Sequence, residues 1–305
     1  MMTGTMHDAL FLTGPSEAPA LDVTVIAAVR RQLDPGSMID ERWLAPGVAW
    51  QGLLAARGRS DHAPLRARLC AVVAPRPIDI NILPAAAQGR KKLLVADMES
   101  TIINQECLDE LAAHAGCQDR VREITARAMR GELAFEAALS ERVALLAGLD
   151  AGLLQEIYTR RVTLMPGAET LVKTMRRHGA YCALVSGGFS FFTERIAARL
   201  GFDSQQANTL LIADGKLTGS VRLPILGREA KLAALHRLTR ELQLRPAETL
   251  AVGDGANDLA MLREAGLGVA FRAKPIVAEA AAARIDHGDL SSLLYLQGYA
   301  RAQFA

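Results

Sequence analysis

Short apolar runs alternate with amphipathic stretches along this chain after residue 92. Runs of four or five apolar residues predict buried strands, and the longer stretches between them predict helices. Such alternation is typical of a parallel sheet with helices on both faces. The predicted strands are 93–96, 182–185, 249–252 and 267–271, the predicted helices are 167–177, 189–200, 228–242 and 256–265, and a hairpin is predicted to turn at Asp214-Gly215.

The first 85 residues follow a different pattern. A strand, a helix, two strands joined by a turn at Pro46-Gly47, a second helix and a final strand are predicted in this order. The order is typical of a small α+β, ferredoxin-like sandwich, and it resembles the small ACT-like ligand-binding domains that are fused to amino-acid enzymes. We find no constellation of reactive side chains here, so packing or regulatory binding is the expected role.

One segment interrupts the later alternation. Residues 105 to about 163 are predicted to be helical, and they directly follow the first strand of the parallel sheet. Ligands bind at the carboxyl ends of the strands in open α/β sheets, so inserted helices would cover that edge as a lid. We therefore expect one domain over 1–85, a second over 86–305, and a helical cap within the second.

The composition narrows the class of protein. Half of the residues are hydrophobic, 22% are charged and the net charge is +2, which gives no basic footprint for nucleic acid. No apolar stretch reaches the length of a membrane span, and no basic leader precedes Arg30. The four cysteines form no Cys-x-x-Cys pair, which favours free thiols in the cytoplasm. We expect a small-molecule substrate and, at most, a second copy of the chain as a homodimeric partner.

Acidic residues follow two of the predicted strands. Asp97 and Glu99 come after the first strand, and Asp254 and Asp258 come after the third. The carboxyl ends of parallel strands meet at one edge, so these side chains are expected to converge. Carboxylates at close range repel each other unless a metal ion lies between them or one holds a proton. Oxygen ligands without nearby His or Cys suit Mg²⁺.

Three other residues predict phosphate binding at the same edge. Ser186 and the amides after it can donate hydrogen bonds to phosphate oxygens, and Gly187 lets the backbone come close. Lys231 supplies a cation for the transferring group or for the nucleophile. With Mg²⁺ and a lysine beside it, a carboxylate can attack phosphorus and form an aspartyl-phosphate. A second carboxylate can then protonate the leaving alcohol and activate water.

Together these motifs resemble those of the haloacid dehalogenase-like phosphatases. From about residue 80 onward the chain resembles, more narrowly, the phosphoserine phosphatase family, including its substrate-binding stretch in the cap. The resemblance implies a Rossmann-like α/β core with a helical cap. The four motifs are Asp97-Met98-Glu99-Ser100-Thr101, Ser186-Gly187-Gly188, Lys231 and Gly253-Asp254-Gly255-Ala256-Asn257-Asp258.

The resemblance also implies a role for each matching residue. Asp97 matches the phosphorylated nucleophile, Glu99 stands at the acid/base position, and Lys231 holds phosphate. The implied Mg²⁺ ligands are Asp97, Asp254 and Glu99 through its backbone carbonyl. In the cap, Glu106 and Arg142 match the groups that grip the ammonium and the carboxylate of serine. The other implied substrate-binding residues are Ser186, Gly187 and Asn257, with Asp258, Met129 and Phe135 in support.

One residue departs from the family pattern. The family has Asp-x-Asp-x-Thr, and here the second acid is Glu99, whose carboxyl lies about one bond length farther from the backbone. A displacement of about 1 Å can cost a hundredfold in rate. The implied function is Mg²⁺-dependent hydrolysis of O-phosphoserine to serine and phosphate, the last step of serine synthesis. Two alternatives stay open: a phosphatase for another small ester, such as phosphohomoserine or phosphothreonine, and a weakly active amino-acid sensor.

Overall fold

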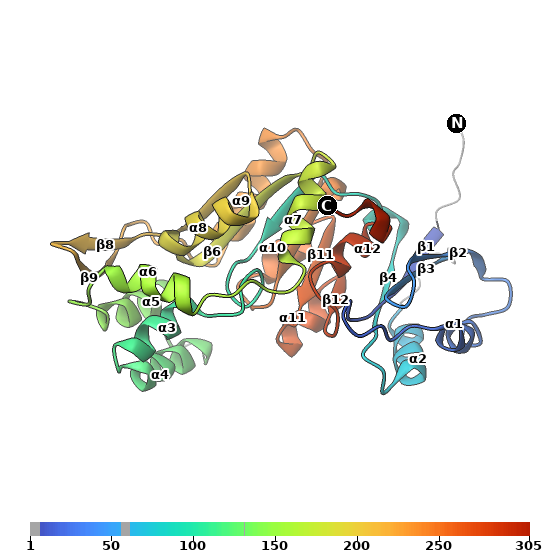
Figure 1. The fold of residues 1–305 in the computed structure, drawn as a ribbon, viewed down its shortest axis with the longest axis horizontal. Helices are drawn as coiled ribbons and strands as arrows, with labels where there is room; N and C mark the ends of the chain where they lie inside the picture. Colours follow the sequence, from blue (N-terminus) through green and yellow to red (C-terminus); the bar gives the residue numbers. More distant parts are fainter. Residues whose placement is uncertain (1–6, 56–61, 131) are drawn as a thin grey trace.

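The computed structural model describes residues 7–55, 62–130 and 132–305 (Figure 1). An antiparallel sheet near the N-terminus and a parallel sheet form two units, and the predicted α/β core with a small α+β unit before it is confirmed. In Figure 1 the N-terminal unit lies to the right of the parallel sheet and the inserted helices lie to its left. The N-terminal unit and the cap are therefore at opposite ends of the core.

The N-terminal unit has the predicted order of elements. Its four strands are arranged β2-β3-β1-β4, which is the antiparallel order of a ferredoxin-like sandwich. Leu10 and Leu12 pack with the two helices, whereas Ala9 and Phe11 belong to the main core of the molecule. Strand β1 is thus buried on both faces, whereas edge strand β2 is largely exposed. The elements are β1 (His7–Thr13), α1 (Val23–Arg30), β2 (Met38–Ala45), β3 (Ala49–Ala55), α2 (Ala63–Val73) and β4 (Asp79–Leu83).

The second sheet is parallel throughout, in the order β12-β11-β10-β5-β6-β7. Its four inner strands are those that the apolar runs predict. The two edge strands were not predicted, because β7 has the polar sequence SQQAN and β12 has only three residues. The strands are β5 (Leu93–Ala96), β6 (Tyr181–Phe189), β7 (Ser204–Asn208), β10 (Thr249–Gly253), β11 (Leu267–Phe271) and β12 (Ala283–Ile285).

Helices cover both faces of the parallel sheet. Side chains alternate along β5, so Leu93 and Val95 pack on one face against α9 (Glu229–Glu241) and α10 (Leu259–Glu264). Leu94 and Ala96 point to the other face, where α7, α8 and α12 complete the main core. This is why β5 is apolar at every position. The helices on this second face are α7 (Ala168–Arg177), α8 (Ser190–Leu200) and α12 (Ser292–Leu296).

Several predicted boundaries differ from those of the structure, and two of these differences lie at the site. The helix predicted over 256–265 begins only at Leu259, because the Asp258 carboxylate accepts the amide of Gly255 at 3.0 Å and holds that segment in a turn. The helix predicted from 189 begins at Ser190, since β6 continues through Phe189. Both shifts keep the segments after strands β6 and β10 non-helical where they meet the site.

The inserted segment is a cap of four helices. A hairpin from a later part of the chain packs against it: Leu217 donates its amide to Leu149 and accepts that of Gly148, both at 2.8 Å. The cap joins the core through two adjacent chain segments, bridged at Ile103 and Leu164. The cap elements are α3 (Cys107–His114), α4 (Gln118–Met129), α5 (Phe135–Ala144), α6 (Gly152–Arg160), and the hairpin strands β8 (Leu210–Ala213) and β9 (Lys216–Val221).

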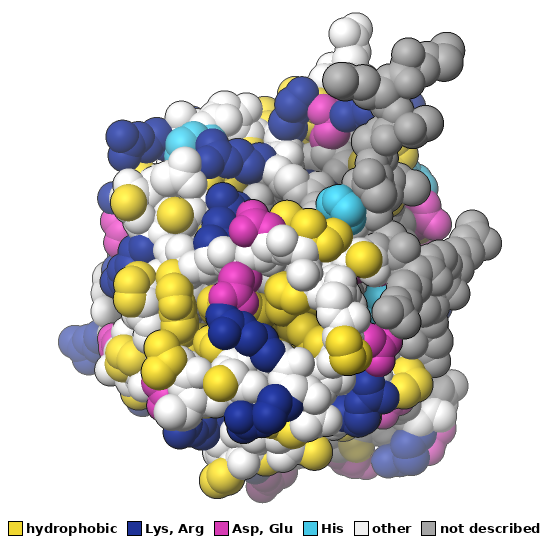
Figure 2. Space-filling model, turned by 90° about the vertical axis from the view of Figure 1, so that its right-hand side faces the viewer, with side chains coloured by type: hydrophobic (Ala, Val, Ile, Leu, Met, Phe, Trp, Pro, Cys, Tyr) yellow, Lys and Arg dark blue, Asp and Glu magenta, His cyan; other side chains and the backbone are white. Residues whose placement is uncertain are grey.

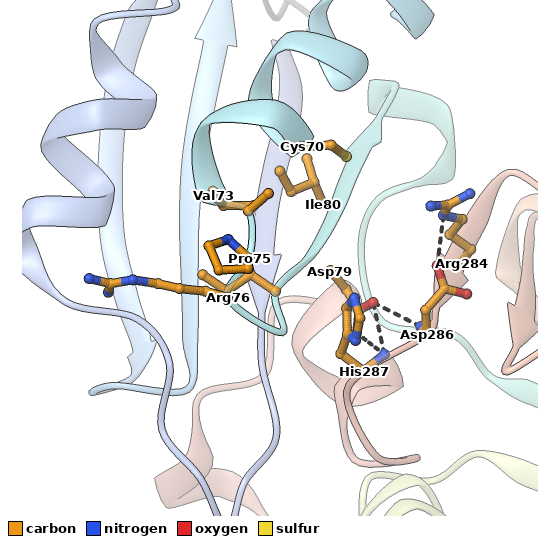
Figure 3. A pocket seen from close by; sticks show the side chains of 11 residues that line it. Cys70, Val73, Pro75, Arg76, Asp79, Ile80, Arg284, Asp286 and His287 are labelled. Carbon is orange, nitrogen blue, oxygen red and sulfur yellow. Dashed lines mark hydrogen bonds and ion pairs between the residues drawn. The ribbon is translucent and has the colours of Figure 1, made fainter.

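Two side chains of β4 join the N-terminal unit to the edge strand β12. The Asn81 amide donates to the carbonyl of Arg284 at 2.9 Å, and its oxygen accepts the N–H of Arg284 at 2.8 Å. The Asp79 carboxylate accepts the amides of Asp286, His287 and Gly288 (Figure 3). These side chains satisfy backbone groups that an edge strand would otherwise leave free. A cavity of about 240 Å³ lies beside this seam, between α2, β4 and the segment after β12.

The end of the molecule that carries the N-terminal unit has a mixed surface. Figure 2 shows hydrophobic side chains there among side chains of both charges. In the N-terminal unit, the large hydrophobic side chains that are exposed are Val23, Ile39 and Trp43. None of the helices in the described ranges combines the length and the apolar character needed to cross a bilayer.

We predict that Asn81→Ala lowers the free energy of unfolding by about 1–3 kcal/mol, because it leaves the buried N–H and C=O of Arg284 without partners. Asn81→Asp should also destabilise the protein, since it keeps the acceptor but places a carboxylate oxygen against the Arg284 carbonyl. Denaturant unfolding of both variants measures the loss. An unchanged midpoint for both would show that this side chain does not hold the two units together.

Candidate active site

The first strand of the site ends in a tight loop. After β5, the carbonyl of Met98 accepts the amides of Ile102 and Ile103 at 2.8 and 2.9 Å, and the chain turns back at Ser100, whose φ is 53°. A non-glycine residue in this left-handed region is uncommon and is often found at functional sites. Inside this loop the Asp97 carboxylate accepts the amide of Met98 at 2.7 Å and is 5% exposed. The loop therefore fixes the orientation of Asp97.

A buried lysine joins carboxylates from two strand ends. The Lys231 ammonium, on α9, lies 2.8 Å from Asp97 after β5 and 2.6 Å from Asp258 after β10. Burial alone would lower the pKa of Lys231, but the carboxylates of Asp258 and Asp97 raise it above its ordinary value. Burial raises the pKa of Asp97, with Asp258 and Asp254 adding to the rise and Lys231 opposing it. A charged lysine is therefore held between two acids out of contact with water.

Three carboxylates converge at this point and fit a divalent cation. Oxygens of Asp97, Asp254 and Asp258 lie within 4.8 Å of one another. Among the described residues, the ammonium group that forms ion pairs with them is that of Lys231, and Lys274 acts on Asp254 from farther away, so three carboxylates face two cations and the cluster keeps an excess of negative charge. Burial, then Asp258 and Glu106, raises the pKa of Asp254 to about 6. An all-oxygen donor set with this excess charge suits Mg²⁺. Of the three predicted metal ligands, the structure brings Asp97 and Asp254 together with Asp258; the Glu99 carboxylate is not in this group.

The Glu99 carboxylate lies toward the base of the cap. It accepts the amide of Cys107, the first residue of α3, at 2.8 Å. Burial raises the pKa of Glu99 to about 8, and Glu106 adds to this rise. Burial therefore favours the protonated form of Glu99 in this arrangement. The thiol of Cys107 also hydrogen-bonds Glu99 and stays protonated, because burial raises the pKa of Cys107 well above its usual value.

The end of β6 contains two glycines and a serine, and it lies beside Glu99. The Ser186 hydroxyl accepts the amide of Gly188 at 2.9 Å, and the Gly187 carbonyl accepts the side-chain amide of Asn208 at the same distance. A Cβ added to Gly187 would lie 3.2 Å from the Phe135 ring, which comes from helix α5 of the cap. The predicted residues Ser186, Gly187 and Phe135 thus meet where the cap approaches the core. Asn208 was not predicted, because it ends the polar edge strand β7 and its partners, the carbonyls of Gly187 and Leu226, lie in distant parts of the chain.

The two predicted cap residues face the same region. The exposed Glu106 accepts the hydroxyl of Ser100 at 2.7 Å. The Arg142 guanidinium is half-buried and donates to the Ala138 carbonyl at 3.1 Å, and it forms no ion pair within the described ranges. Burial lowers the pKa of Arg142, while Asp109, Glu99 and Glu106 oppose this. A partly buried arginine without a carboxylate partner is free to bind an anionic ligand.

The structure leaves two of the predicted residues without a described contact to the acids. Asn257 is half-buried in the turn after β10, where a Cβ added to Gly255 would lie 2.3 Å from its oxygen. Met129 ends helix α4, and its side chain lies outside the described residues. One residue without a predicted role of its own does reach the acids: the Thr101 hydroxyl lies 3.4 Å from Asp254.

A model of the haloacid dehalogenase-like hydrolases matches residues 94–263, which include the motifs of all three strand ends and Lys231. The chain belongs to this family. A phosphoserine phosphatase of Streptomyces coelicolor is 47% identical to this hydrolase over 80% of the chain, and the match spans 59% of that relative's own length.

Solved structures agree with the fold of the hydrolase. A haloacid dehalogenase family hydrolase of Salmonella enterica serovar Typhi has a TM-score of 0.85 at 31% identity, covering 96% of this chain and 98% of that one. A phosphoserine phosphatase, solved as an analogue of its phospho-aspartyl intermediate, has a TM-score of 0.63 at 41% identity. It covers 68% of this chain and 98% of its own. The first of these likenesses extends over the N-terminal unit as well as the core.

We predict that Mg²⁺ raises the thermal unfolding temperature of the hydrolase by several degrees, because it binds only the folded arrangement of carboxylates. Asp254→Asn should lose at least half of this rise, since it removes one charged ligand from the cluster. Asp214→Asn, a change on the exposed hairpin turn, is the matched control and should keep the full rise. The measurement is made against NaCl of equal ionic strength. An equal Mg²⁺ effect in Asp254→Asn and the control would place the cation elsewhere.

Proposed function

We propose that this hydrolase is a Mg²⁺-dependent phosphoserine phosphatase that works through an aspartyl-phosphate on Asp97. The observation that carries the proposal is the Lys231 ammonium between Asp97 and Asp258, with Asp254 close by. This arrangement holds a carboxylate beside a fixed cation and an oxygen-lined cation site, as nucleophilic attack on a phosphate ester requires. The relatives named phosphoserine phosphatase support the choice of substrate.

The residues that would hold Mg²⁺ are Asp97, Asp254 and the Glu99 carbonyl, which the family resemblance assigns, and Asp258, whose carboxylate lies in the same cluster. Bound there, Mg²⁺ would neutralise negative charge on the phosphate and on the acids around it. Lys231 keeps its proton throughout and holds Asp97 in place while charge develops on the phosphoryl oxygens. Ser186 and the amides that follow it orient the phosphate from the other side.

The reaction then takes two steps, with Glu99 moving one proton in each. In the first step an oxygen of Asp97 forms a bond to phosphorus, the bond from phosphorus to the serine oxygen breaks, and the Glu99 proton passes to that oxygen. In the second, the Glu99 carboxylate takes a proton from water, the water oxygen bonds to phosphorus, and the bond between Asp97 and phosphorus breaks. Inorganic phosphate leaves with Asp97 restored and Glu99 again protonated.

The cap supplies recognition of the serine part. The Arg142 guanidinium is offered for the substrate carboxylate, and the Glu106 carboxylate for the ammonium group. Both cap residues lie near Glu99. The charge of Glu106 adds to the rise in the pKa of Glu99, and the charges of Glu99 and Glu106 oppose the lowering of the pKa of Arg142 by burial. A sugar phosphate lacks both groups and would leave them unpaired, which favours an amino-acid ester.

We also propose the residue boundaries of the two units and of the cap, and the cellular location of the protein. The N-terminal unit is assigned to residues 1–85, the phosphatase unit to 86–305, and the cap to about 105–163. The gap between β4, which ends at Leu83, and β5, which begins at Leu93, supports the first division. A cytoplasmic location suits the four free cysteines, which a reducing compartment would keep as thiols.

Phosphate release from L-phosphoserine in the presence of Mg²⁺ tests the proposal directly. We predict turnover by the full chain and a loss of at least about a thousandfold in kcat for Asp97→Asn, which removes the nucleophile. Asp214→Asn is the control for a carboxylate lost far from the site, and it should keep the rate of the unchanged chain. Binding of phosphoserine without release of phosphate would instead favour the sensor.

A second prediction tests the role of Arg142. Arg142→Ala should lower kcat/KM for phosphoserine by at least about tenfold, because a charge-assisted pair to the substrate carboxylate is lost. The same change should alter kcat/KM for O-phosphoethanolamine, which has no carboxylate, by less than about threefold. Steady-state kinetics with both esters measures the difference. An equal loss for both would assign Arg142 to the structure of the cap rather than to recognition.

A further inference from the structure

The Glu99 side chain is one methylene longer than the aspartate of the family pattern, and the structure shows where the extra length goes. Its carboxylate does not join the cluster of Asp97, Asp254 and Asp258. It reaches instead to the start of helix α3, where the Cys107 N–H donates to Oε1 at 2.8 Å. That N–H is one of the helix's first amides, which have no partner inside the helix. The longer acid therefore satisfies a backbone donor of the cap.

On its other side, the Glu99 carboxylate lies against Gly188, at the end of β6. A Cβ added to Gly188 would lie 2.6 Å from Oε2 and 2.9 Å from both Cδ and Oε1. The φ of Gly188 is outside the left-handed region, so its backbone would accept an alanine. A side chain at 188 would therefore displace the carboxylate of Glu99 from the position that it has in the structure.

Gly188 also belongs to the phosphate-binding segment. Its own amide donates to the Ser186 hydroxyl at 2.9 Å, and both residues are buried. A carboxylate pushed away by a larger residue at 188 would have to change its hydrogen bond with the Cys107 amide, which holds it from the cap side. The Glu99 carboxylate therefore lies between the Gly188 backbone and the N–H of Cys107. We call these two groups the receptacle of Glu99.

We propose that Gly188 and Cys107 are positioning residues that fit a glutamate, rather than an aspartate, for proton transfer at position 99. The inference rests on the proposed phosphatase function and adds to it the reason why the longer acid works. It makes the residue at 99 and the residue at 188 interdependent. A side chain at 188 should be harmful with Glu99 present and much less harmful with the shorter Asp.

The first experiment is a double-mutant cycle of Gly188→Ala with Glu99→Asp, measured as the single-turnover rate of serine release from phosphoserine. With Glu99, Gly188→Ala should lower this rate about a hundredfold, as expected for an acid displaced by about 1 Å. With Glu99→Asp in place, the same change should cost less than about tenfold. Gly187→Ala is the matched control: its Cβ would meet Phe135, not Glu99, so its fold-change should be equal in both backgrounds.

A second readout separates positioning of the acid from general damage. The p-nitrophenolate ion leaves without needing a proton, so a displaced acid hardly affects its release. In single turnover, Gly188→Ala should slow release of p-nitrophenolate from its phosphate ester by less than about fivefold, against the hundredfold loss for serine. Equal losses with the two esters, or equal losses in the two backgrounds at 99, would overturn the inference.

The amide of Cys107 can be removed by itself. Cys107 is the first residue of α3, where proline is well tolerated, and Glu106 before it is extended, with φ −95° and ψ 105°. Cys107→Pro should therefore keep the helix but lower the rate of serine release at least tenfold. Cys107→Ala keeps the amide and loses only the thiol, so its loss should be under about threefold. Equal rates for the two variants would remove Cys107 from the proposal.

A stability measurement keeps the inference testable if no phosphatase activity is found. Gly188→Ala should lower the thermal unfolding temperature by about 3 °C or more beyond its effect in the Glu99→Asp background, because the clash exists without substrate. Equal drops in the two backgrounds would contradict the receptacle, whatever the activity. Absence of turnover with unequal drops would instead overturn the proposed function and leave the fit of Glu99 to Gly188 in place.

Discussion

The ion pairs of one buried lysine hold the site of this molecule together. Lys231 comes from helix α9, and its partners Asp97 and Asp258 come from the ends of two neighbouring strands. An ammonium group removed from water is stable only with carboxylates around it, and those carboxylates would repel each other without it. The ion pairs therefore hold helix α9 and the ends of strands β5 and β10 in place relative to one another. Because Asp254 adds a third carboxylate, the cluster keeps an excess of negative charge that suits a divalent cation.

The cap and the N-terminal unit lie at opposite ends of the core. The cap approaches from the carboxyl ends of the strands, where Phe135 lies over Gly187 and the Cys107 amide meets Glu99. The N-terminal unit lies at the far side of the core (Figure 1). Asn81 joins it to edge strand β12, and Asp79 joins it to the segment after β12 (Figure 3). The residues proposed for catalysis and recognition thus lie at the carboxyl ends of the strands. The contacts at edge strand β12 attach the N-terminal unit to the core.

The apolar runs predicted the inner strands, because each of these strands is buried on both faces and most of its residues are apolar. The apolar runs did not predict β7 or β12, because edge strands bury less apolar surface than inner strands and so need fewer apolar residues. The order of motifs predicted that Asp97, Asp254 and Asp258 converge, but the Glu99 carboxylate, expected in the same group, lies at the start of helix α3 instead. The order of motifs also did not predict the contacts that depend on exact side-chain length, such as that of Glu99 with Gly188, or the bonds of Asn208, whose partners are far away in the chain.

The most direct test of this account is to find where phosphate resides during turnover. The full chain is mixed with L-phosphoserine and Mg²⁺, quenched in acid within one turnover, and digested for tandem mass spectrometry. The account predicts a phosphoryl group on Asp97, absent when Mg²⁺ is replaced by a chelator. Phosphate on another residue, or serine formed at full rate with Asp97 never modified, would contradict it.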